Sequence, residues 1–161
     1  MKKFTIQIVV LLVITFAALG FVTSKLPVLN FSPTTQQQTV KLKVGDTTVN
    51  VEIADDTDKR KKGLAGRDSL ATDSGMLFVY STPDKYIYWM KGVRFPIDII
   101  WIRENQVVDL LKNVPIPKQG QSDNELPRYT TSFTVDKVLE VNAGFINAHG
   151  VKLGDKVETV K

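Results

Sequence analysis

The stretch that decides the fold is GLAGRDSLATDSGMLFVYSTPDKYIYWMKGVRFPIDIIWI, residues 63–102. Its apolar runs are rich in β-branched and aromatic residues and are separated by glycines, prolines and acids, a pattern typical of short strands joined by turns. Within it we expect strands at residues 75–80, 86–91 and 97–103. Glycines, Trp89 and a few charged residues interrupt these runs. The stretch therefore contains either a binding site or a tightly packed core that requires these particular residues.

The sequence on either side adds more strands and two short helices. Residues 39–44 and 47–53 alternate apolar with polar residues around Gly45-Asp46, which is typical of a β-hairpin. An acidic start and a basic end before Gly63 predict a helix at residues 56–62. We also expect strands at residues 107–114, 132–141 and 156–160, a long loop at 115–127 and a helix at 142–149. Seven or eight strands with two short helices predict an α+β, mostly β fold: a small antiparallel sheet that is either curled or closed into a barrel.

The first 38 residues differ in composition from the rest. After Lys2 and Lys3, residues 4–22 are almost entirely apolar, and a helix of that length, at about 1.5 Å per residue, nearly crosses a hydrocarbon core of about 30 Å. We therefore expect a transmembrane anchor at residues 1–22, a flexible tether at 23–38 and one globular domain at 39–161. The alternative is a signal peptide that is cleaved near Gly20, giving a secreted or periplasmic protein. Because the lysines precede the apolar segment, we expect a single-pass membrane protein with its C-terminal domain outside the cytoplasm.

The charge balance argues against a nucleic-acid partner. The chain has 21 basic and 17 acidic residues, and removing Lys2, Lys3 and Lys25 leaves 18 basic residues against 17 acidic ones in the domain. A nearly neutral domain lacks the basic surface of a nucleic-acid-binding protein. The partners that we expect are the membrane, through residues 4–22, and an unidentified small ligand or envelope protein.

We expect neither a cofactor nor a metal. The chain has no cysteine, so packing alone must stabilise the domain. His149 is the only histidine, which excludes a site with several histidine ligands. No glycine-rich nucleotide-binding motif is present.

Five residues form a candidate polar cluster for ligand binding or for structure: Arg67, Trp89, Lys91, Asp98 and Glu140. Asp98 lies in an apolar strand, and a buried charge there needs a basic partner, which we expect to be Arg67, Lys91 or Arg94. Trp89 and Lys91 alternate onto one face of their strand, as either an aromatic platform for a flat ligand or a core tryptophan with a lysine at the strand exit. Glu140 interrupts an apolar run and either pairs locally or acts with Asp98 as an acid–base couple.

Two basic features have more than one interpretation. Arg67 lies between glycines, where it could bind a carboxylate or phosphate, although turn chemistry explains the glycines equally well. The basic run at residues 59–62 is either a solvated helix end or a patch for phosphate or lipid headgroups.

Four motifs, in this order, carry a family resemblance: GLAGRDSL, GMLFVY, YWMKGVRFPIDIIWI and VLEVNAGFINAHGVKLGDKV. They resemble the domain of unknown function 192 family, small bacterial and archaeal proteins that are often carried behind a signal or anchor segment. The family pattern falls on Gly63, Leu64, Arg67, Leu70, Gly75, Met76, Leu77, Phe78, Trp89, Met90, Lys91, Pro96, Asp98, Leu139, Glu140, Ala143, Gly144, Gly150, Gly154 and Asp155. The chain departs from it at Ala65, where methionine is common, and at Gly92 and Val93, where an asparagine–threonine pair is common. The resemblance implies a compact β-rich domain with short helices and no particular substrate.

Three functions are compatible with these observations. The first is a membrane-tethered, extracytoplasmic binding or accessory module of the cell envelope. The second is a hydrolase or lyase that uses Asp98 and Glu140 as its carboxylates. The third is a purely structural or protein-interaction domain. The lack of a recognisable catalytic set favours a protein that is not an enzyme.

Overall fold

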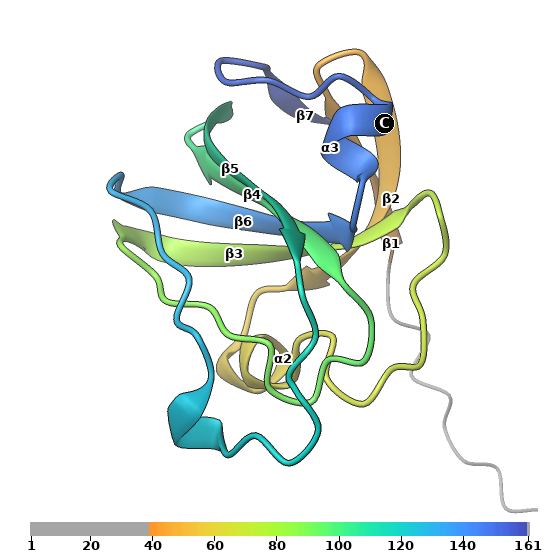
Figure 1. The fold of residues 1–161 in the computed structure, drawn as a ribbon. Helices are drawn as coiled ribbons and strands as arrows, with labels where there is room; N and C mark the ends of the chain where they lie inside the picture. Colours follow the sequence, from red (N-terminus) through yellow and green to blue (C-terminus); the bar gives the residue numbers. More distant parts are fainter. Residues whose placement is uncertain (1–38, 161) are drawn as a thin grey trace, which may run out of the picture. The chain divides into compact units, whose positions relative to one another are not determined.

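A computed structural model describes residues 39–160 (Figure 1). The anchor and tether predicted at residues 1–38 lie outside the described residues. Within residues 39–160, no helix has the length and apolar character that a membrane crossing requires.

Seven strands form a single sheet in the order β5-β4-β6-β3-β2-β1-β7. They are β1 (Thr39–Val44), β2 (Thr47–Ala54), β3 (Ser74–Asp84), β4 (Ile97–Arg103), β5 (Gln106–Val114), β6 (Val135–Asn142) and β7 (Val157–Val160). The helices are α2 (Thr57–Lys62) and α3 (Phe145–Ala148), with a short 3₁₀ turn, η2 (Asp123–Glu125). Neighbouring strands are antiparallel except β2 and β3, which are parallel and are connected through α2. The expectation of a mostly antiparallel β fold with two short helices is confirmed.

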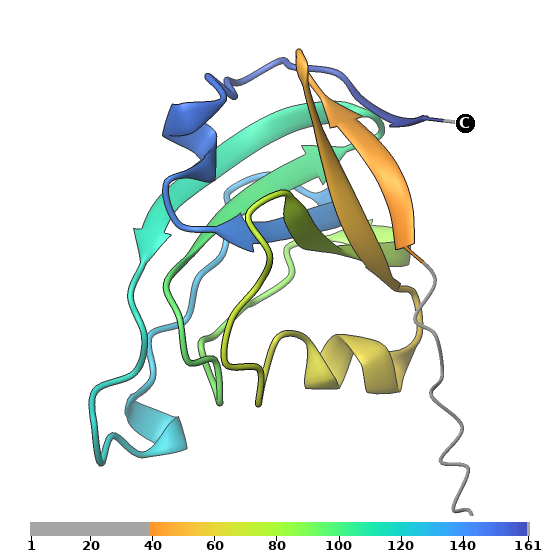
Figure 2. The same cartoon turned by 90° about the vertical axis from the view of Figure 1, so that its right-hand side faces the viewer.

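The sheet curls into a half-barrel (Figures 1 and 2). Its two edge strands meet at one end, where Val107 N donates to Asp155 O and Val157 N donates to Asn105 O, each at 2.9 Å. An isolated bridge between Gln106 and Lys156 belongs to the same contact. In both views α3 and β7 lie at one end of the domain and α2 lies at the other.

The central strand β4 is buried on both faces, since residues 97–102 are all buried. Side chains of a strand alternate between faces. Ile100 and Ile102 therefore pack into one hydrophobic cluster with Leu139, under α3. Ile99 and Trp101 pack into a second cluster on the opposite face, which the chain between β3 and β4 helps to cover. Burial on both faces explains why the run PIDIIWI shows no apolar–polar alternation.

The predicted hairpin and first helix are confirmed. Leu42 pairs with Val49 across the β1–β2 hairpin, as the apolar alternation predicted, and both are buried. The side chain of Asp56 caps α2 by accepting the Lys59 N–H at 2.8 Å. Gly63 ends α2 with a φ of 47°, a left-handed conformation that glycine adopts without strain.

The strand predicted at residues 86–91 is wrong. This segment forms only an isolated bridge, in which Tyr88 and Tyr129 exchange backbone hydrogen bonds of 2.8 and 2.9 Å. The physical reason is that both edges of the preceding strand, β3, are already occupied by β2 and β6. The predicted alternation nevertheless holds, because Tyr88 and Met90 are buried whereas Trp89 is exposed.

The helix predicted at residues 142–149 is shorter than expected. Gly144 has a φ of 89°, and α3 spans only Phe145–Ala148. The expected strand at 132–141 starts later, at Val135. The general position of each element is therefore correct, and the errors lie at its ends.

Strands β3 and β6 approach so closely at Gly75 that a side chain has no room. A Cβ there would lie 2.8 Å from Glu140 O and 3.0 Å from Val141 Cγ1. We expect Gly75→Ala to lower the free energy of unfolding by roughly 2–3 kcal/mol, because it overpacks a rigid backbone contact. Urea denaturation measures the loss. Gly120→Ala is the control: its φ of +78° adds strain of about 1 kcal/mol, but its Cβ meets nothing within 4 Å. Equal losses in the two variants would contradict the packing argument.

Candidate functional site

Asp98 is fully buried and has no basic partner. Its carboxylate accepts two backbone N–H groups, from Asn113 at 2.8 Å and from Ile146 at 2.9 Å. None of the ion pairs formed within residues 39–160 includes Asp98. The expectation of a basic partner is therefore wrong, because two charge-assisted hydrogen bonds from the backbone stabilise this carboxylate without an opposite charge.

Arg67 binds Glu52 and does not approach Asp98. Its two terminal nitrogens donate to the two carboxylate oxygens of Glu52 at 2.5 and 2.6 Å. This hydrogen bonding raises the pKa of the Arg67 guanidinium. The fork-shaped pair attaches the loop that follows α2 to strand β2, so Arg67 has a structural partner and is not free to bind an anion.

The other two basic candidates form surface pairs. Lys91 lies 2.5 Å from Asp123, and Arg94 lies 2.5 Å from Asp68. All four side chains are at least half exposed, so each pair contributes about 1 kcal/mol or less.

Asp98 and Glu140 project to opposite faces of the sheet. Across β4 and β6, Asp98 pairs with Val141, and Ile99 pairs with Glu140. Directly paired residues share a face, and successive residues along a strand do not. Asp98 thus faces the cluster that contains Val141, and Glu140 faces the cluster that contains Ile99. The proposed acid–base couple of these two carboxylates is wrong.

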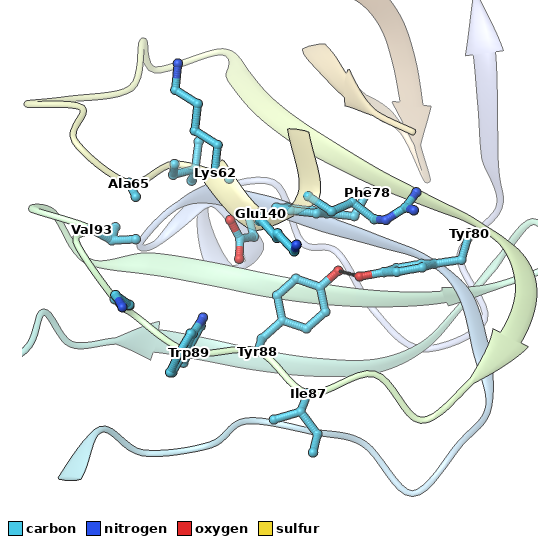
Figure 3. A pocket seen from close by; sticks show the side chains of 14 residues that line it. Lys62, Ala65, Phe78, Tyr80, Ile87, Tyr88, Trp89, Val93 and Glu140 are labelled. Carbon is cyan, nitrogen blue, oxygen red and sulfur yellow. Dashed lines mark hydrogen bonds between the residues drawn. The ribbon is translucent and has the colours of Figure 1, made fainter. Parts of the chain in front are cut away.

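Glu140 faces a small cavity on the second face of the sheet (Figure 3). Its volume is about 90 Å³, which is room for about three water molecules. The walls come from the end of α2 and the loop after it, from β3, and from the segment before β4. The lining residues are Arg60, Lys61, Lys62, Gly63, Leu64, Ala65, Phe78, Tyr80, Ile87, Tyr88, Trp89, Lys91, Val93 and Glu140. Of the five residues in the predicted cluster, the cavity brings together Trp89, Lys91 and Glu140; Arg67 and Asp98 lie elsewhere.

The Glu140 side chain is only 5% exposed, and its carboxylate points into the cavity (Figure 3). No hydrogen-bond donor or cation of the described chain binds it, and burial raises its pKa to about 8. At pH 7 the group is therefore mainly protonated. A neutral carboxyl offers the cavity one O–H donor together with acceptor oxygens.

Tyrosines form one wall of the cavity. The hydroxyl groups of Tyr80 and Tyr88 are 2.7 Å apart. The rings of Tyr88 and Phe78 pack edge to face, with their centroids 5.2 Å apart. Tyr80 also stacks on Tyr86. Burial raises the pKa of Tyr88 above its ordinary value, so this hydroxyl stays neutral. The wall is thus an aromatic surface with paired hydroxyls.

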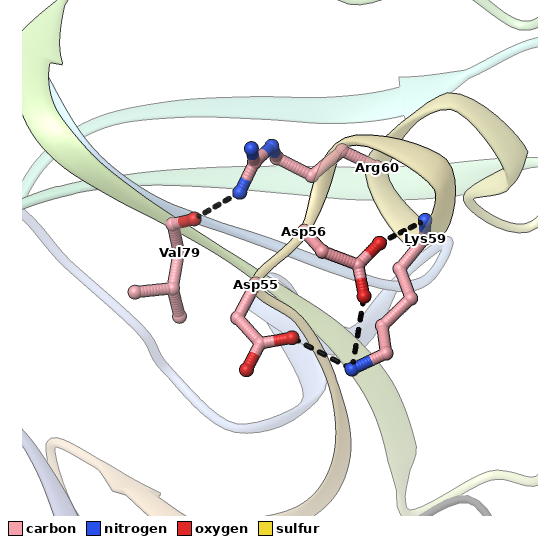
Figure 4. Close-up of polar contacts among 5 residues, drawn as sticks. All are labelled: Asp55, Asp56, Lys59, Arg60 and Val79. Carbon is pink, nitrogen blue, oxygen red and sulfur yellow. Dashed lines mark hydrogen bonds and ion pairs between the residues drawn. The ribbon is translucent and has the colours of Figure 1, made fainter.

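Helix α2 supplies the basic rim of the cavity. Figure 4 shows the contacts that its Lys59 and Arg60 make. Its first turn is neutralised internally, because Lys59 lies 2.7 Å from Asp55 and 3.3 Å from Asp56. Arg60 donates to Val79 O at 2.9 Å, which fixes the helix against β3. Lys61 and Lys62 follow on the cavity side.

Sequence reasoning missed part of this site. It did not include Tyr80 or Tyr88 among the candidate site residues, and it left the run at residues 59–62 between a solvated helix end and an anion patch. The signal available in the sequence was GLAG, residues 63–66, directly after the basic run. This turn places the end of α2 over the sheet. Ala65 and Gly92, where the chain departs from the family pattern, also meet here: a Cβ on Gly92 would lie 3.1 Å from the Ala65 Cβ.

His149 lies at the α3 end, away from this cavity, where its Nδ1 is 3.1 Å from Thr47 Oγ1. In the part of the chain that the structure describes, no group of three or more histidine, cysteine, aspartate or glutamate side chains could hold a metal ion.

The sequence of residues 40–159 matches the DUF192 family, described as "Uncharacterized ACR". The chain belongs to this family. The resemblance expected from its four motifs is confirmed, and the match covers nearly the whole folded domain. A comparison with curated proteins gives no match.

Two solved structures resemble this DUF192 domain. A proposed transcription regulator of Sinorhizobium meliloti 1021 is 26% identical; the match covers 76% of this chain and 95% of that one, with a TM-score of 0.69. A protein of unknown function from Novosphingobium aromaticivorans is 28% identical; the match covers 78% and 89% of the two chains, with a TM-score of 0.68.

Removing the Asp98 carboxylate leaves two buried backbone donors without an acceptor. We expect Asp98→Ala to lower the free energy of unfolding by about 3–5 kcal/mol, and Asp98→Asn to lower it less, because the amide keeps one acceptor oxygen. Urea denaturation measures both. The matched control is Asp68→Ala, which breaks an exposed pair and changes stability by less than about 1 kcal/mol. A similar small loss for Asp98→Ala would contradict the assigned role.

The raised pKa of Glu140 makes the stability of the domain depend on pH. The pKa is about 8 in the folded state and near its ordinary value of 4.5 in the unfolded state, so stability falls as pH rises from about 4.5 and levels off above about 8. We expect Glu140→Gln to be more stable than the wild type at pH 8, by a few kcal/mol, and equal to it near pH 4. Denaturation at the two pH values measures the difference. A difference that does not change with pH would show that Glu140 ionises as freely as in the unfolded chain.

Proposed function

We propose that this DUF192 domain binds a small anionic group, a carboxylate or an inorganic oxyanion, in the Glu140 cavity. The observation that carries the proposal is a nearly buried carboxyl group without a partner among the described residues, pointing into a cavity with a basic rim. The proposal makes the domain a binding module and not an enzyme.

The charge around the cavity favours an anion. Arg60, Lys61 and Lys62 line it, as does Lys91, which is paired with Asp123, whereas Glu140 is the one acid among the lining residues. With Glu140 protonated, the lining carries no negative charge at neutral pH. The carboxyl O–H can then donate to an anion while the rim supplies the opposite charge.

The size of the cavity limits the ligand. At about 90 Å³ it lies well below the roughly 300–1,000 Å³ of ordinary small-molecule pockets. It therefore fits the charged end of a ligand and not a sugar ring or a nucleotide. The exposed indole of Trp89 stands at the mouth, where the remainder of a larger ligand can lie against it.

Catalysis is less well supported than binding. A hydrolase or lyase needs a second acid or base, or a nucleophile with an adjacent base. The residues that line this cavity include no serine, threonine, histidine or second carboxylate, and its other proton-transfer groups are lysines and two tyrosines whose hydroxyls bond to each other. The description of the Sinorhizobium neighbour as a proposed transcription regulator does not transfer either, because 18 basic against 17 acidic residues give this domain no excess of positive charge for DNA.

The proposal includes a membrane tether. The apolar residues 4–22 would anchor the chain, the polar residues 23–38 would connect it to the domain, and the lysines at the start would keep the domain outside the cytoplasm. The site would then sample ligands at the outer face of the membrane. Cleavage near Gly20 would instead release the same module.

Acetate and sulfate are suitable probes because both remain anionic between pH 6 and pH 10. Each should bind the wild type most tightly below pH 8 and about tenfold more weakly per pH unit above it, because binding needs the protonated Glu140. Glu140→Gln should retain binding and lose this pH dependence. Titration calorimetry or the fluorescence of Trp89 measures the affinity.

The matched control is Glu158→Gln on β7, which should keep the affinity and pH dependence of the wild type. Two results would refute anion binding at this cavity: an affinity independent of pH in the wild type, or tighter binding of methylammonium than of acetate.

A further inference from the structure

Two large apolar side chains project into solvent at the mouth of the Glu140 cavity. Ile87 is 66% exposed and Trp89 is 39% exposed, and the residues between and after them, Tyr88 and Met90, are buried. The bridge between Tyr88 and Tyr129 holds this segment by its backbone. The two side chains therefore project outward because their neighbours anchor the segment in the core.

Cations surround these apolar side chains. The guanidinium of Arg128 lies 3.9 Å from the centre of the Trp89 ring, and Lys61 and Lys62 line the same cavity as Ile87 and Trp89. None of these three cations forms an ion pair within residues 39–160. We call Ile87, Trp89, Lys61, Lys62 and Arg128 the α2 face. Lys91 lies beside the α2 face, but Asp123 neutralises it.

The described chain begins on the side of the α2 face. Thr39, where the described chain begins, pairs with Glu52, and the hairpin turn at Gly45 lies at the far end of β1. From Glu52 the chain needs only five residues to reach the start of α2. Figures 1 and 2 show β2 descending from the hairpin to α2, with α3 and β7 at the opposite end.

We propose that the α2 face rests on the surface of a bilayer that contains anionic phospholipids, with Trp89 and Ile87 in the interfacial layer. Indole rings favour the membrane interface, and each basic residue near an anionic surface adds to the attraction. The lysines and Arg128 contact lipid phosphates, and the ring of Trp89 lies at the level of the headgroups. The inference rests on the membrane tether of the proposed function and is independent of anion binding by Glu140.

This orientation gives the cavity a defined position. Its mouth, lined by Trp89, Ile87 and Lys62, opens toward the headgroup layer. Sixteen tether residues span at most about 53–58 Å, so the chain is long enough to let the domain rest on the membrane or leave it. The attraction of the basic residues to anionic lipid and the apolar contacts of Ile87 and Trp89 then determine what fraction of the time the α2 face is bound to the membrane.

The test uses the full chain in vesicles of phosphatidylcholine alone or with one third phosphatidylglycerol, each prepared with and without brominated lipid. The chain has two tryptophans, and Trp101 is 2% exposed within the core. Bromine quenching therefore reports mainly on Trp89, and Trp89→Phe gives the background. Co-flotation with the vesicles reports separately on the tether.

We expect quenching of Trp89 in the anionic vesicles, with much less in phosphatidylcholine alone or in 0.5 M salt. Lys61→Glu with Lys62→Glu should abolish the lipid-dependent part, and Ile87→Ser should reduce it at least twofold. The matched controls lie at the opposite end of the domain: Lys152→Glu with Lys156→Glu makes the same change in charge, and Leu153→Ser removes an equally exposed side chain, 62% against 66%. In these control variants, brominated lipid should quench the fluorescence of Trp89 as strongly as in the wild type.

The outcomes separate the two proposals. Flotation without Trp89 quenching would overturn the docking of the α2 face and leave the tether intact. Quenching that is equal in the two lipid mixtures, or that the control variants lower as much as the α2-face variants, would also overturn it. Loss of flotation would refute the tether itself, and neither result bears on the acetate titration of Glu140.

Discussion

The structure depends on a central strand that is buried on both of its faces. Because successive side chains of β4 point in opposite directions, each face of the sheet needs its own cover. α3 and the inside of the half-barrel cover one face. The loops after α2 and before β4 cover the other face, and their incomplete packing there leaves the Glu140 cavity. The cavity is thus a consequence of covering a sheet with irregular chain.

The same alternation gives two buried carboxylates opposite roles. Asp98 lies where two backbone N–H groups converge, so its charge is stabilised and it connects β4 to β5 and to the start of α3. Glu140, one strand away, meets aromatic rings and open space, and burial without a partner raises its pKa. A buried carboxylate whose oxygens accept hydrogen bonds stabilises a fold. A buried carboxylate without hydrogen-bond partners lowers stability and is typical of a site where it can meet a ligand.

Membership in DUF192 and the likeness to two solved structures establish the family and the fold, and neither names an activity. The residues of the site therefore have to indicate the function. Glu140, the end of α2 and the exposed Trp89 lie together, so one surface combines a cavity suited to an anion with a rim suited to a charged interface. The two proposals share Lys61, Lys62 and Trp89 of that surface. They differ in that anion binding depends on Glu140, whereas membrane docking depends on Ile87 and Arg128.

Local patterns in the sequence determined the hairpin, α2, and the position of β4, because alternation, helix capping and turn glycines act between neighbours in the chain. Composition also determined the near neutrality of the domain and marked residues 4–22 as apolar. Only the tertiary structure decided that residues 86–91 are not a strand, since that depends on whether a sheet edge is free. It alone decided the partners of Asp98 and the isolation of Glu140. Both depend on strand register and on which loop crosses which face, and these contacts join residues far apart in the chain, which no local pattern encodes.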